Sequence, residues 1–322
     1  MTRENRLVPS PRVDQAPPLR LRRSCLAVPG TSARALAKAP TLAVDMVFLD
    51  LEDSVPEAQK TDETRLRVAE ALRGPDWRAA TLAVRVNEVG SAWWEDDLRV
   101  VVGRAGASLD CVIVPKVESV DELAAVDRLL TDLEEEADAG RPIGIEVQIE
   151  SARGLVEVER IAGSSQPRLE TLVFGPGDYA ATLGVPQRSV GETDPDYPGD
   201  QWHYARSRIA TAAHAFSLAP IDGPYAAIRD LDGLRESARQ ARLVGFEGKW
   251  VVHPDQIPVC DEVFSPTPEE LADALSVLEG LEGAAAEGRG ASLHDGRMVD
   301  EASRRIAEAV VRRAEAAGVG AS

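Results

Sequence analysis

Cysteine is scarce in this sequence, and the usual marks of secreted and membrane proteins are absent. Cys25, Cys111 and Cys260 are an odd number without paired spacing, which excludes a disulfide framework and a cysteine-based zinc site. No window approaches the ~18–20 consecutive apolar residues of a membrane helix, and residues 1–20 contain no apolar signal-peptide core. These absences predict a reduced, cytoplasmic protein without a membrane partner.

Positive charge is also in the minority. Lys and Arg number 36 against 54 Asp and Glu, which gives a net charge of −18 over 322 residues. A general nucleic-acid binder needs a basic face to neutralise phosphates, so this acidity excludes nucleic acid as a partner. An anionic small ligand needs only a local basic patch. The basic residues that could provide one lie in the first third of the chain, at Arg22, Arg23, Arg34, Lys38 and Arg85.

The N-terminal residues 1–21 are predicted to form a flexible arm. Four of the 21 prolines fall within residues 1–20, and the segment is polar and rich in arginine. An arginine-rich, acid-poor start is also typical of an organellar transit peptide. The prolines would break the amphipathic helix of such a peptide, so a disordered arm is the favoured interpretation.

Between residues 22 and 264, short apolar runs alternate with segments of helical periodicity. The runs are 24–30, 46–53, 81–87, 111–118, 143–150, 171–178, 218–225 and 248–254. Apolar strands separated by helices predict a parallel sheet covered by helices. Eight such units predict a closed (β/α)8 TIM barrel that forms the catalytic domain. A doubly wound open sheet is the alternative, weakened because no G-x-G-x-x-G follows the first strand.

Residues 265–322 are predicted to form a C-terminal helical extension. A Thr-Pro-Glu-Glu start opens a helix over 265–288, a glycine-rich loop follows over 288–300, and an amphipathic helix spans 301–318. The extension is too small for an independent domain. It is therefore expected to pack on the barrel or on a neighbouring subunit.

Two acidic residues, Glu150 and Asp178, end the fifth and sixth predicted strands. The carboxyl ends of barrel strands meet on one face, where barrel enzymes have their active sites. Two carboxylates there suit a hard cation such as Mg²⁺, whereas the four histidines lack the spacing of a zinc site. Two solvated strand-end acids are the alternative. The glycines of G-P-G-D favour a ligand, because they allow it to approach the backbone.

Other charged residues also stand at predicted strand ends. Arg85 lies in an apolar strand and needs an anionic partner, either a structural carboxylate or a substrate carboxylate or enolate. Strand neighbours point to opposite faces, so at most one of Glu52 and Asp53 is expected to face the barrel centre, while the other caps the next helix. Lys116 is either a Schiff-base lysine or the ion-pair partner of Glu118 or another strand-end acid.

Several motifs of the chain, taken together, are typical of one enzyme family. They read RRSCLAVPG, DMVFLDLEDSV, VRVN, VPKVES, IEVQIESARGL, VFGPGDYAATLG, PIDGPY, GFEGKWVVHPDQI and DGRMVDEAS. On these motifs, the chain resembles the CoA-ester lyases of the citrate lyase β-chain family, from about residue 22 to the last helix. This family includes malyl-CoA, β-methylmalyl-CoA and citramalyl-CoA lyases. The resemblance implies a (β/α)8 barrel assembled into homotrimers or hexamers.

The resemblance also implies roles for single residues. Glu150 and Asp178 match the ligands of Mg²⁺, for which Mn²⁺ is a possible substitute, and Arg85 matches an arginine that contacts the substrate and its thioester enolate. Asp295 matches an acid–base residue that reaches the active site of a neighbouring subunit. The extension over 265–322 is thereby expected to complete a site on another copy of the chain.

Four further residues match positions near coenzyme A. Arg34 and Lys38 correspond to basic positions near the CoA phosphates, and Ile221 and Asp222 to a segment that lines the CoA path. Coenzyme A would thus enter as part of the substrate.

The functional prediction is a Mg²⁺-dependent carbon–carbon lyase. It would reversibly cleave malyl-CoA or β-methylmalyl-CoA to glyoxylate plus acetyl-CoA or propionyl-CoA by a Claisen-type mechanism. The alternatives are a citramalyl-CoA lyase that gives pyruvate and acetyl-CoA, a malyl-CoA thioesterase, and a noncatalytic citrate-lyase-like subunit. The last predicts loss of Glu150, Asp178, Arg85 or Asp295, and all four are present. A single methyl group separates pyruvate from glyoxylate and is worth only ~1–3 kcal/mol in a pocket, so the sequence does not choose between these oxo-acids.

Overall fold

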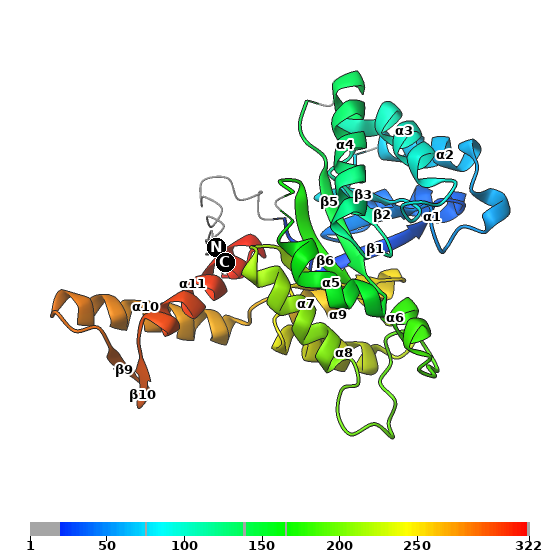
Figure 1. Cartoon of the computed structure of the whole chain (residues 1–322). Coiled ribbons are helices and arrows are strands. Elements are labelled where there is room, and N and C mark those ends of the chain that lie inside the picture. Colours follow the sequence, from blue (N-terminus) through cyan, green and yellow to red (C-terminus); the bar gives the residue numbers. More distant parts are fainter. Residues whose placement is uncertain (1–19, 75, 138–139, 165, 321–322) are drawn as a thin grey trace, which may run out of the picture.

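The computed structural model describes residues 20–74, 76–137, 140–164 and 166–320. The predicted arm, apart from Arg20 and Leu21, lies outside these described residues. The central element is a closed barrel of eight parallel strands that follow one another in sequence order (Figure 1). The strands are β1 (Ser24–Pro29), β2 (Met46–Asp50), β3 (Thr81–Arg85), β4 (Cys111–Val114), β5 (Gly144–Ile149), β6 (Leu169–Phe174), β7 (Ala219–Asp222) and β8 (Gly248–Val251).

Helices follow the strands and cover the outside of the barrel. They are α1 (Ala33–Lys38), α2 (Asp62–Leu72), α3 (Trp94–Ala105), α4 (Val120–Ala137), α5 (Ala152–Ala162), α6 (Pro176–Leu183), α7 (His203–Ala215), α8 (Leu231–Leu243) and α9 (Ile257–Phe264). The predicted (β/α)8 barrel is therefore confirmed, and the open doubly wound sheet is excluded by the closure of β1 on β8.

Strand pleating divides the buried residues into two layers. Met46 and Phe48 of β2 point into the barrel, where Phe48 contacts Trp250 with ring centroids 4.4 Å apart. Val47 and Leu49 point outward and pack beneath the helices. The same alternation continues to the carboxyl ends of the strands and decides which side chains reach the mouth of the barrel.

All eight predicted strands are present, but several end earlier than the sequence suggested. The run 46–53 stops being a strand at Asp50, and the run 171–178 stops at Phe174. Asp178 consequently lies in the first turn of α6 and not at the end of a strand. The predicted runs were too long because they counted the polar residues of the following turns as part of each strand.

The C-terminal extension comprises two helices joined by a hairpin. These elements are α10 (Pro268–Ala286), β9 (Ser292–His294), β10 (Arg297–Val299) and α11 (Glu301–Ala316). The expected glycine-rich loop is thus wrong in part, because its middle forms two antiparallel strands. Asp295 and Gly296 both have positive φ, 46° and 74°, as a two-residue hairpin turn requires.

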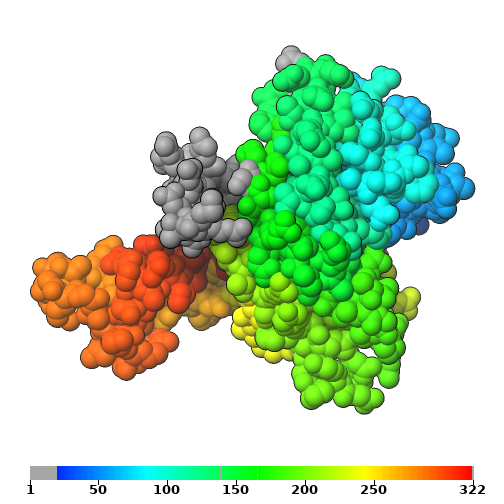
Figure 2. Space-filling model, viewed as in Figure 1, coloured from blue at the N-terminus to red at the C-terminus, as the bar shows by residue number. Residues whose placement is uncertain are grey.

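The extension has a small core of its own and limited contact with the barrel. Ala274, Val277, Leu281, Val299 and Ala307 form that core. Arg313 of α11 pairs with Glu247 at 3.1 Å, and Arg242 of α8 pairs with Glu270 at 2.6 Å. Figures 1 and 2 show the orange and red extension projecting from the body of the molecule. Among the described residues, no helix combines the length and apolar character needed to cross a membrane.

Candidate active site

Arg85 lies at the carboxyl end of β3 and is fixed by Asp50 at the end of β2. These residues are register partners on neighbouring strands. The Nε and Nη2 atoms of Arg85 each donate to one Asp50 oxygen, both at 2.7 Å. Of the two partners that the sequence left open for Arg85, the structure supplies a structural carboxylate. The remaining nitrogen, Nη1, faces Glu52 at 3.1 Å.

Glu52 and Asp53 do not divide between two faces. Both approach the guanidinium of Arg85, at 3.1 Å and 3.7 Å, and both contact the ammonium of Lys116. The expectation that at most one of them faces the barrel centre is therefore wrong. Its physical basis fails because β2 ends at Asp50, so Glu52 and Asp53 belong to a turn and strand alternation does not apply to them.

Lys116 follows β4 and joins three acidic residues. Its Nζ atom pairs with Glu52, with Asp53 at 3.2 Å and with Asp178 at 3.4 Å. Its backbone N–H donates to Oε1 of Glu150 at 2.9 Å. These ion pairs raise the pKa of the ammonium despite its partial burial. A raised pKa opposes a Schiff-base role, which requires the neutral amine, and agrees with the ion-pair interpretation.

The structure brings Glu150 and Asp178 to the same mouth, as the sequence predicts. Glu150 follows β5, is buried, and accepts a hydrogen bond from Nε2 of Gln148 at 2.6 Å. Asp178 stands across from it in the first turn of α6, where both contact Lys116. Between them, a Cβ at Gly175 would lie 2.4 Å from the Cβ of Glu150. The first glycine of G-P-G-D therefore makes room for the Glu150 side chain.

Protonation of the site is strongly perturbed. Burial raises the pKa of Glu150 well above its usual range, and the neighbouring Asp178 and Glu52 carboxylates add to this rise. Burial also raises the pKa of Glu52 to about 7, against the opposing effect of Arg85. Asp50 is equally buried, but the Arg85 guanidinium holds its pKa below the usual range. Burial thus favours the protonated form of Glu150 and Glu52, whereas the paired hydrogen bonds from Arg85 keep Asp50 ionised.

The balance of acidic and cationic side chains at the site shows whether its residues suit a divalent cation. Two cationic side chains, Arg85 and Lys116, face five acidic ones. The acidic residues are Asp50, Glu52, Asp53, Glu150 and Asp178. In addition, the Oδ2 atom of Asp178 is buried and accepts no hydrogen bond from the described residues. Oxygen ligands with uncompensated negative charge are what Mg²⁺ prefers, so the donor set fits that ion.

The residues matched to the CoA phosphates are accessible. Arg34 and Lys38 lie one helical turn apart on α1, which follows β1 at the same end of the barrel, and both are exposed. A pair of cations at this spacing presents its charges on one helix face. Their role in binding CoA remains a prediction.

Ile221 and Asp222 are both fully buried. Ile221 points into the barrel interior, whereas Asp222 points outward and pairs with Arg206 at 3.1 Å and with the buried Lys249. Neither side chain reaches a surface that a CoA chain could follow. The prediction that this segment lines the CoA path therefore depends on its backbone.

Asp295 lies at the tip of the β9–β10 hairpin and is highly exposed, with 79% of its side chain accessible. Its neighbours are residues of the extension: His294 lies 3.8 Å away and in turn contacts Asp273 at 2.9 Å. The hairpin stands on the projecting extension, away from the mouth of the same barrel (Figure 1). Asp295 thus lies apart from Glu150 and Asp178, the two proposed metal ligands.

The sequence missed Asp50 and Gln148, which orient Arg85 and Glu150. Both are polar residues within apolar strands and occupy inward-facing positions. Gln148 of β5 and Glu150, directly after β5, lie on the same face, and Asp50 shares a face of β2 with Phe48. Period-two alternation was the signal that could have identified them.

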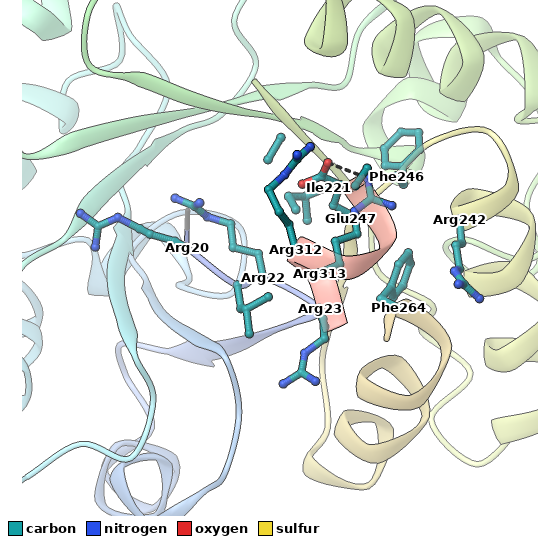
Figure 3. Close-up of a pocket in the computed structure, with 13 residues that line it drawn as sticks. Arg20, Arg22, Arg23, Ile221, Arg242, Phe246, Glu247, Phe264, Arg312 and Arg313 are labelled. Carbon is teal, nitrogen blue, oxygen red and sulfur yellow. Dashed lines mark hydrogen bonds and ion pairs between the residues drawn. The ribbon is translucent and has the colours of Figure 1, made fainter. Parts of the chain in front are cut away.

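A cavity of about 150 Å³ lies at the opposite, amino-terminal end of the barrel (Figure 3). Arginines dominate its lining, among them Arg22 and Arg23. Arg22 pairs with Glu146 at 2.7 Å and Glu170 at 2.5 Å, and Arg23 with Asp45 at 2.7 Å. The idea that Arg22 and Arg23 serve an anionic ligand is therefore not supported, because structural carboxylates already neutralise them.

Comparison with known proteins agrees with this architecture. A model of the HpcH/HpaI aldolase/citrate lyase family matches residues 23–254, which is most of the barrel. The chain belongs to the HpcH/HpaI aldolase/citrate lyase family. Its members are enzymes, and the curated relatives of this chain are named mainly as lyases. The noncatalytic alternative has no support from these matches.

Relatives within the family match nearly the whole chain. An L-malyl-CoA/beta-methylmalyl-CoA lyase of Cereibacter sphaeroides is 37% identical, covering 94% of this chain and 98% of the relative. A (3S)-malyl-CoA thioesterase of the same species is 34% identical, covering 91% and 95%. The Mycobacterium tuberculosis protein CitE, solved in complex with magnesium, acetoacetate and coenzyme A, is 33% identical, with a TM-score of 0.72 and coverage of 91% and 97%. The chain is accordingly a CoA-ester lyase by family.

Proposed function

We propose that the chain is a Mg²⁺-dependent lyase that cleaves malyl-CoA or β-methylmalyl-CoA to glyoxylate and acetyl-CoA or propionyl-CoA, and also catalyses the reverse condensation. The observation that carries this proposal is the buried Glu150 beside Asp178 at the barrel mouth, with Arg85 held rigidly by Asp50 in the same cluster. The relatives named as malyl-CoA/beta-methylmalyl-CoA lyases support the same substrates.

Glu150 and Asp178 would hold the cation. When bound there, Mg²⁺ supplies a Lewis acid for the oxygens of the oxo-acid or hydroxy-acid end of the substrate. The magnesium in the related CitE structure supports this assignment. The raised pKa of Glu150 supports it as well, because a buried carboxylate without a cation in contact is costly to ionise.

Arg85 would stabilise the negative charge that develops on the thioester oxygen. Two of its nitrogens are already occupied by Asp50, so the guanidinium needs no reorganisation during the reaction. Pre-oriented charge of this kind lowers the barrier because no solvent must reorient. The face of the Trp250 ring, 5.5 Å from the guanidinium carbon, supports Arg85 from inside the barrel.

Asp295 would move the substrate proton. In condensation it removes a proton from the acyl methyl or methylene carbon, and in cleavage it returns that proton. An exposed carboxylate on a projecting hairpin suits a residue that completes the active site of a neighbouring copy. A homotrimer, or a hexamer of two such trimers, would supply that neighbour.

Apolar residues around Asp295 favour this docking. Leu293 and Met298 face each other across the hairpin and are 78% and 72% exposed. Exposed apolar pairs rimmed by polar residues are typical of interaction sites. With the hairpin of one copy over the barrel mouth of another, these side chains would be covered.

The substrate is tested by incubating the protein with Mg²⁺, acetyl-CoA or propionyl-CoA, and either glyoxylate or pyruvate, and reading products by mass. We expect malyl-CoA and β-methylmalyl-CoA with glyoxylate, and no product when a chelator removes the metal. Predominant condensation with pyruvate would instead identify a citramalyl-CoA lyase. Formation of free CoA and malate from acetyl-CoA and glyoxylate, with no malyl-CoA left among the products, would identify a thioesterase.

The metal site is tested separately with Glu150→Gln. We expect at least a tenfold rise in the Mg²⁺ concentration that gives half-maximal turnover, since about 1.4 kcal/mol of metal binding corresponds to that factor. Glu118→Gln is the matched control, because Glu118 lies on the neighbouring β4–α4 connection and accepts a hydrogen bond from Ser151 at 2.6 Å. Unchanged Mg²⁺ dependence in Glu150→Gln would remove Glu150 from the metal site.

A further inference from the structure

Lys116 has an unusual backbone for its residue type. Its φ is +53°, a left-handed conformation that it shares with only Ser217 and Asp295 among the described non-glycine residues. This conformation costs a lysine roughly 1–2 kcal/mol. It allows the backbone N–H to donate to Glu150 at 2.9 Å while the ammonium reaches Asp178 at 3.4 Å. One residue thereby contacts both proposed metal ligands.

The Lys116 ammonium is held more firmly by Glu52 and Asp53, which form the acidic turn after β2, than by Asp178. It donates to Glu52 and, at 3.2 Å, to Asp53. At 3.4 Å, its distance to Oδ2 of Asp178 exceeds that of a good hydrogen bond, so this contact is electrostatic. The same Asp178 oxygen is buried without a hydrogen-bond donor in the described part of the chain. The Lys116 ammonium thus offsets the negative charge of Asp178 without donating a hydrogen bond to its Oδ2 atom.

We propose that the Lys116 ammonium occupies the cation position beside Asp178 when the metal is absent, and that a divalent cation displaces it from Asp178 while its contacts with Glu52 and Asp53 remain. This inference rests on the proposed metal site at Glu150 and Asp178. Displacement breaks no hydrogen bond at Oδ2 of Asp178, because this atom accepts none from the described residues. The two contacts with the acidic turn remain available to hold the displaced ammonium.

The consequence is that Lys116 weakens metal binding. The carboxylates of the site attract a divalent ion less strongly, because the positively charged Lys116 ammonium stays nearby and repels it in a partly buried site. The backbone N–H keeps its own contact with Glu150, so removing only the ammonium leaves Glu150 oriented. Lys116 is therefore a positioning residue that makes the site less negative and keeps the metal exchangeable.

The test measures Mn²⁺ affinity of the full-length protein from the amplitude of the free-ion signal in electron paramagnetic resonance, without substrate. Lys116→Met should lower the Mn²⁺ dissociation constant by about tenfold, from removal of one nearby charge. Lys116→Asn should do the same and suits the left-handed backbone. Lys116→Arg keeps the charge and should remain close to the wild type. Lys60→Met is the control, since Lys60 contacts Asn87 and Trp93 instead of the acidic cluster.

Unchanged or weaker Mn²⁺ binding in both folded variants, Lys116→Met and Lys116→Asn, would overturn this inference. Equal tightening in Lys60→Met would also overturn it, because the effect would then be one of overall charge. Glu150→Gln, measured in the same way, separates this outcome from failure of the proposed function. If Glu150→Gln binds Mn²⁺ as tightly as the wild type, the metal site itself is wrong; if it loses Mn²⁺ while the Lys116 variants do not gain, only the role of Lys116 is wrong.

Discussion

At the scale of single residues, the site balances burial against charge. Glu52 is buried between two cations, yet its pKa rises to about 7 because loss of solvent outweighs their attraction. Asp53, its half-exposed neighbour, has a lowered pKa through its contacts with Glu52, Arg85 and Lys116. The two carboxylates of the acidic turn therefore differ in protonation near neutral pH, and only one of them is a stable anion there.

This difference predicts a pH-dependent stability of the metal-free protein. The folded pKa of Glu52 is raised, so its contribution to stability is complete below its unfolded pKa near 4.5 and is lost as the pH rises through about 7. The free energy of unfolding should fall over this window by on the order of 3 kcal/mol. Glu52→Gln should flatten that fall, measured by urea unfolding at fixed protein concentration with chelator present.

The exposed Glu57, on the same connection, provides the control. Glu57→Gln should keep the wild-type slope of stability against pH. Parallel slopes for the wild type and Glu52→Gln would show that Glu52 titrates in the folded protein as it does in the unfolded one, contrary to this prediction.

Strand alternation explains which site residues the sequence could identify. Arg85 and Glu150 were recognisable because they are charged residues at the ends of apolar strands, and both point inward. Asp50 was missed because it was counted as one more residue of an apolar run. Asp222 was placed near CoA by resemblance. Because neighbouring strand residues point to opposite faces and Ile221 points inward, Asp222 points outward, to Arg206 and Lys249 beneath the helices. Reading strand ends without assigning their two faces leaves the direction of such side chains undetermined.

At the scale of elements, the β9–β10 hairpin is short and lies on the extension, where it packs on α10. Its strands have three residues each, and it carries exposed apolar side chains at Leu293 and Met298. An isolated hairpin of this size is marginally stable in water. A partner surface that covers the apolar pair would stabilise both the hairpin and the position of Asp295 at its tip.

Replacing that apolar pair should therefore impair assembly before it impairs folding. The double variant Leu293→Ser/Met298→Ser should shift the protein to smaller species in multi-angle light scattering and reduce turnover at least tenfold, because the covered apolar surface is worth several kcal/mol. Its circular dichroism should match that of the wild type. Leu243→Ser is the control, since Leu243 is 71% exposed on the barrel helix α8. Wild-type size and turnover in the double variant would argue against a docked hairpin.

The hairpin also marks a limit of reading elements from sequence. The segment 288–300 has three glycines and few apolar residues, so it was read as a loop. Its Asp-Gly pair was a hairpin signal, since both central residues of such a turn need positive φ. The barrel strands were predictable because long apolar runs repeat eight times between helices. A three-residue strand has no such periodicity, and its pairing is decided by the turn.

At the scale of the whole molecule, the acidic groups proposed for catalysis lie in two separate places. Glu150 and Asp178 are at the barrel mouth, and Asp295 is on the extension, which its own ion pairs hold away from that mouth. Closed rings of identical subunits unite such places through head-to-tail contacts. A barrel from one copy and a hairpin from the next would then form each complete site.

Subunit mixing tests this arrangement. Asp295→Asn and Asp178→Asn should each be nearly inactive. Arg85 is a poor choice for such a variant, because its loss would leave Asp50 buried without a cation. After the two variants are unfolded together and refolded at equal amounts, half of the barrels and half of the hairpins are intact. Random assembly into head-to-tail rings then restores about one quarter of wild-type turnover, whatever the ring size. A site built within one chain would gain nothing from mixing, so an inactive hybrid of native size would refute the shared site.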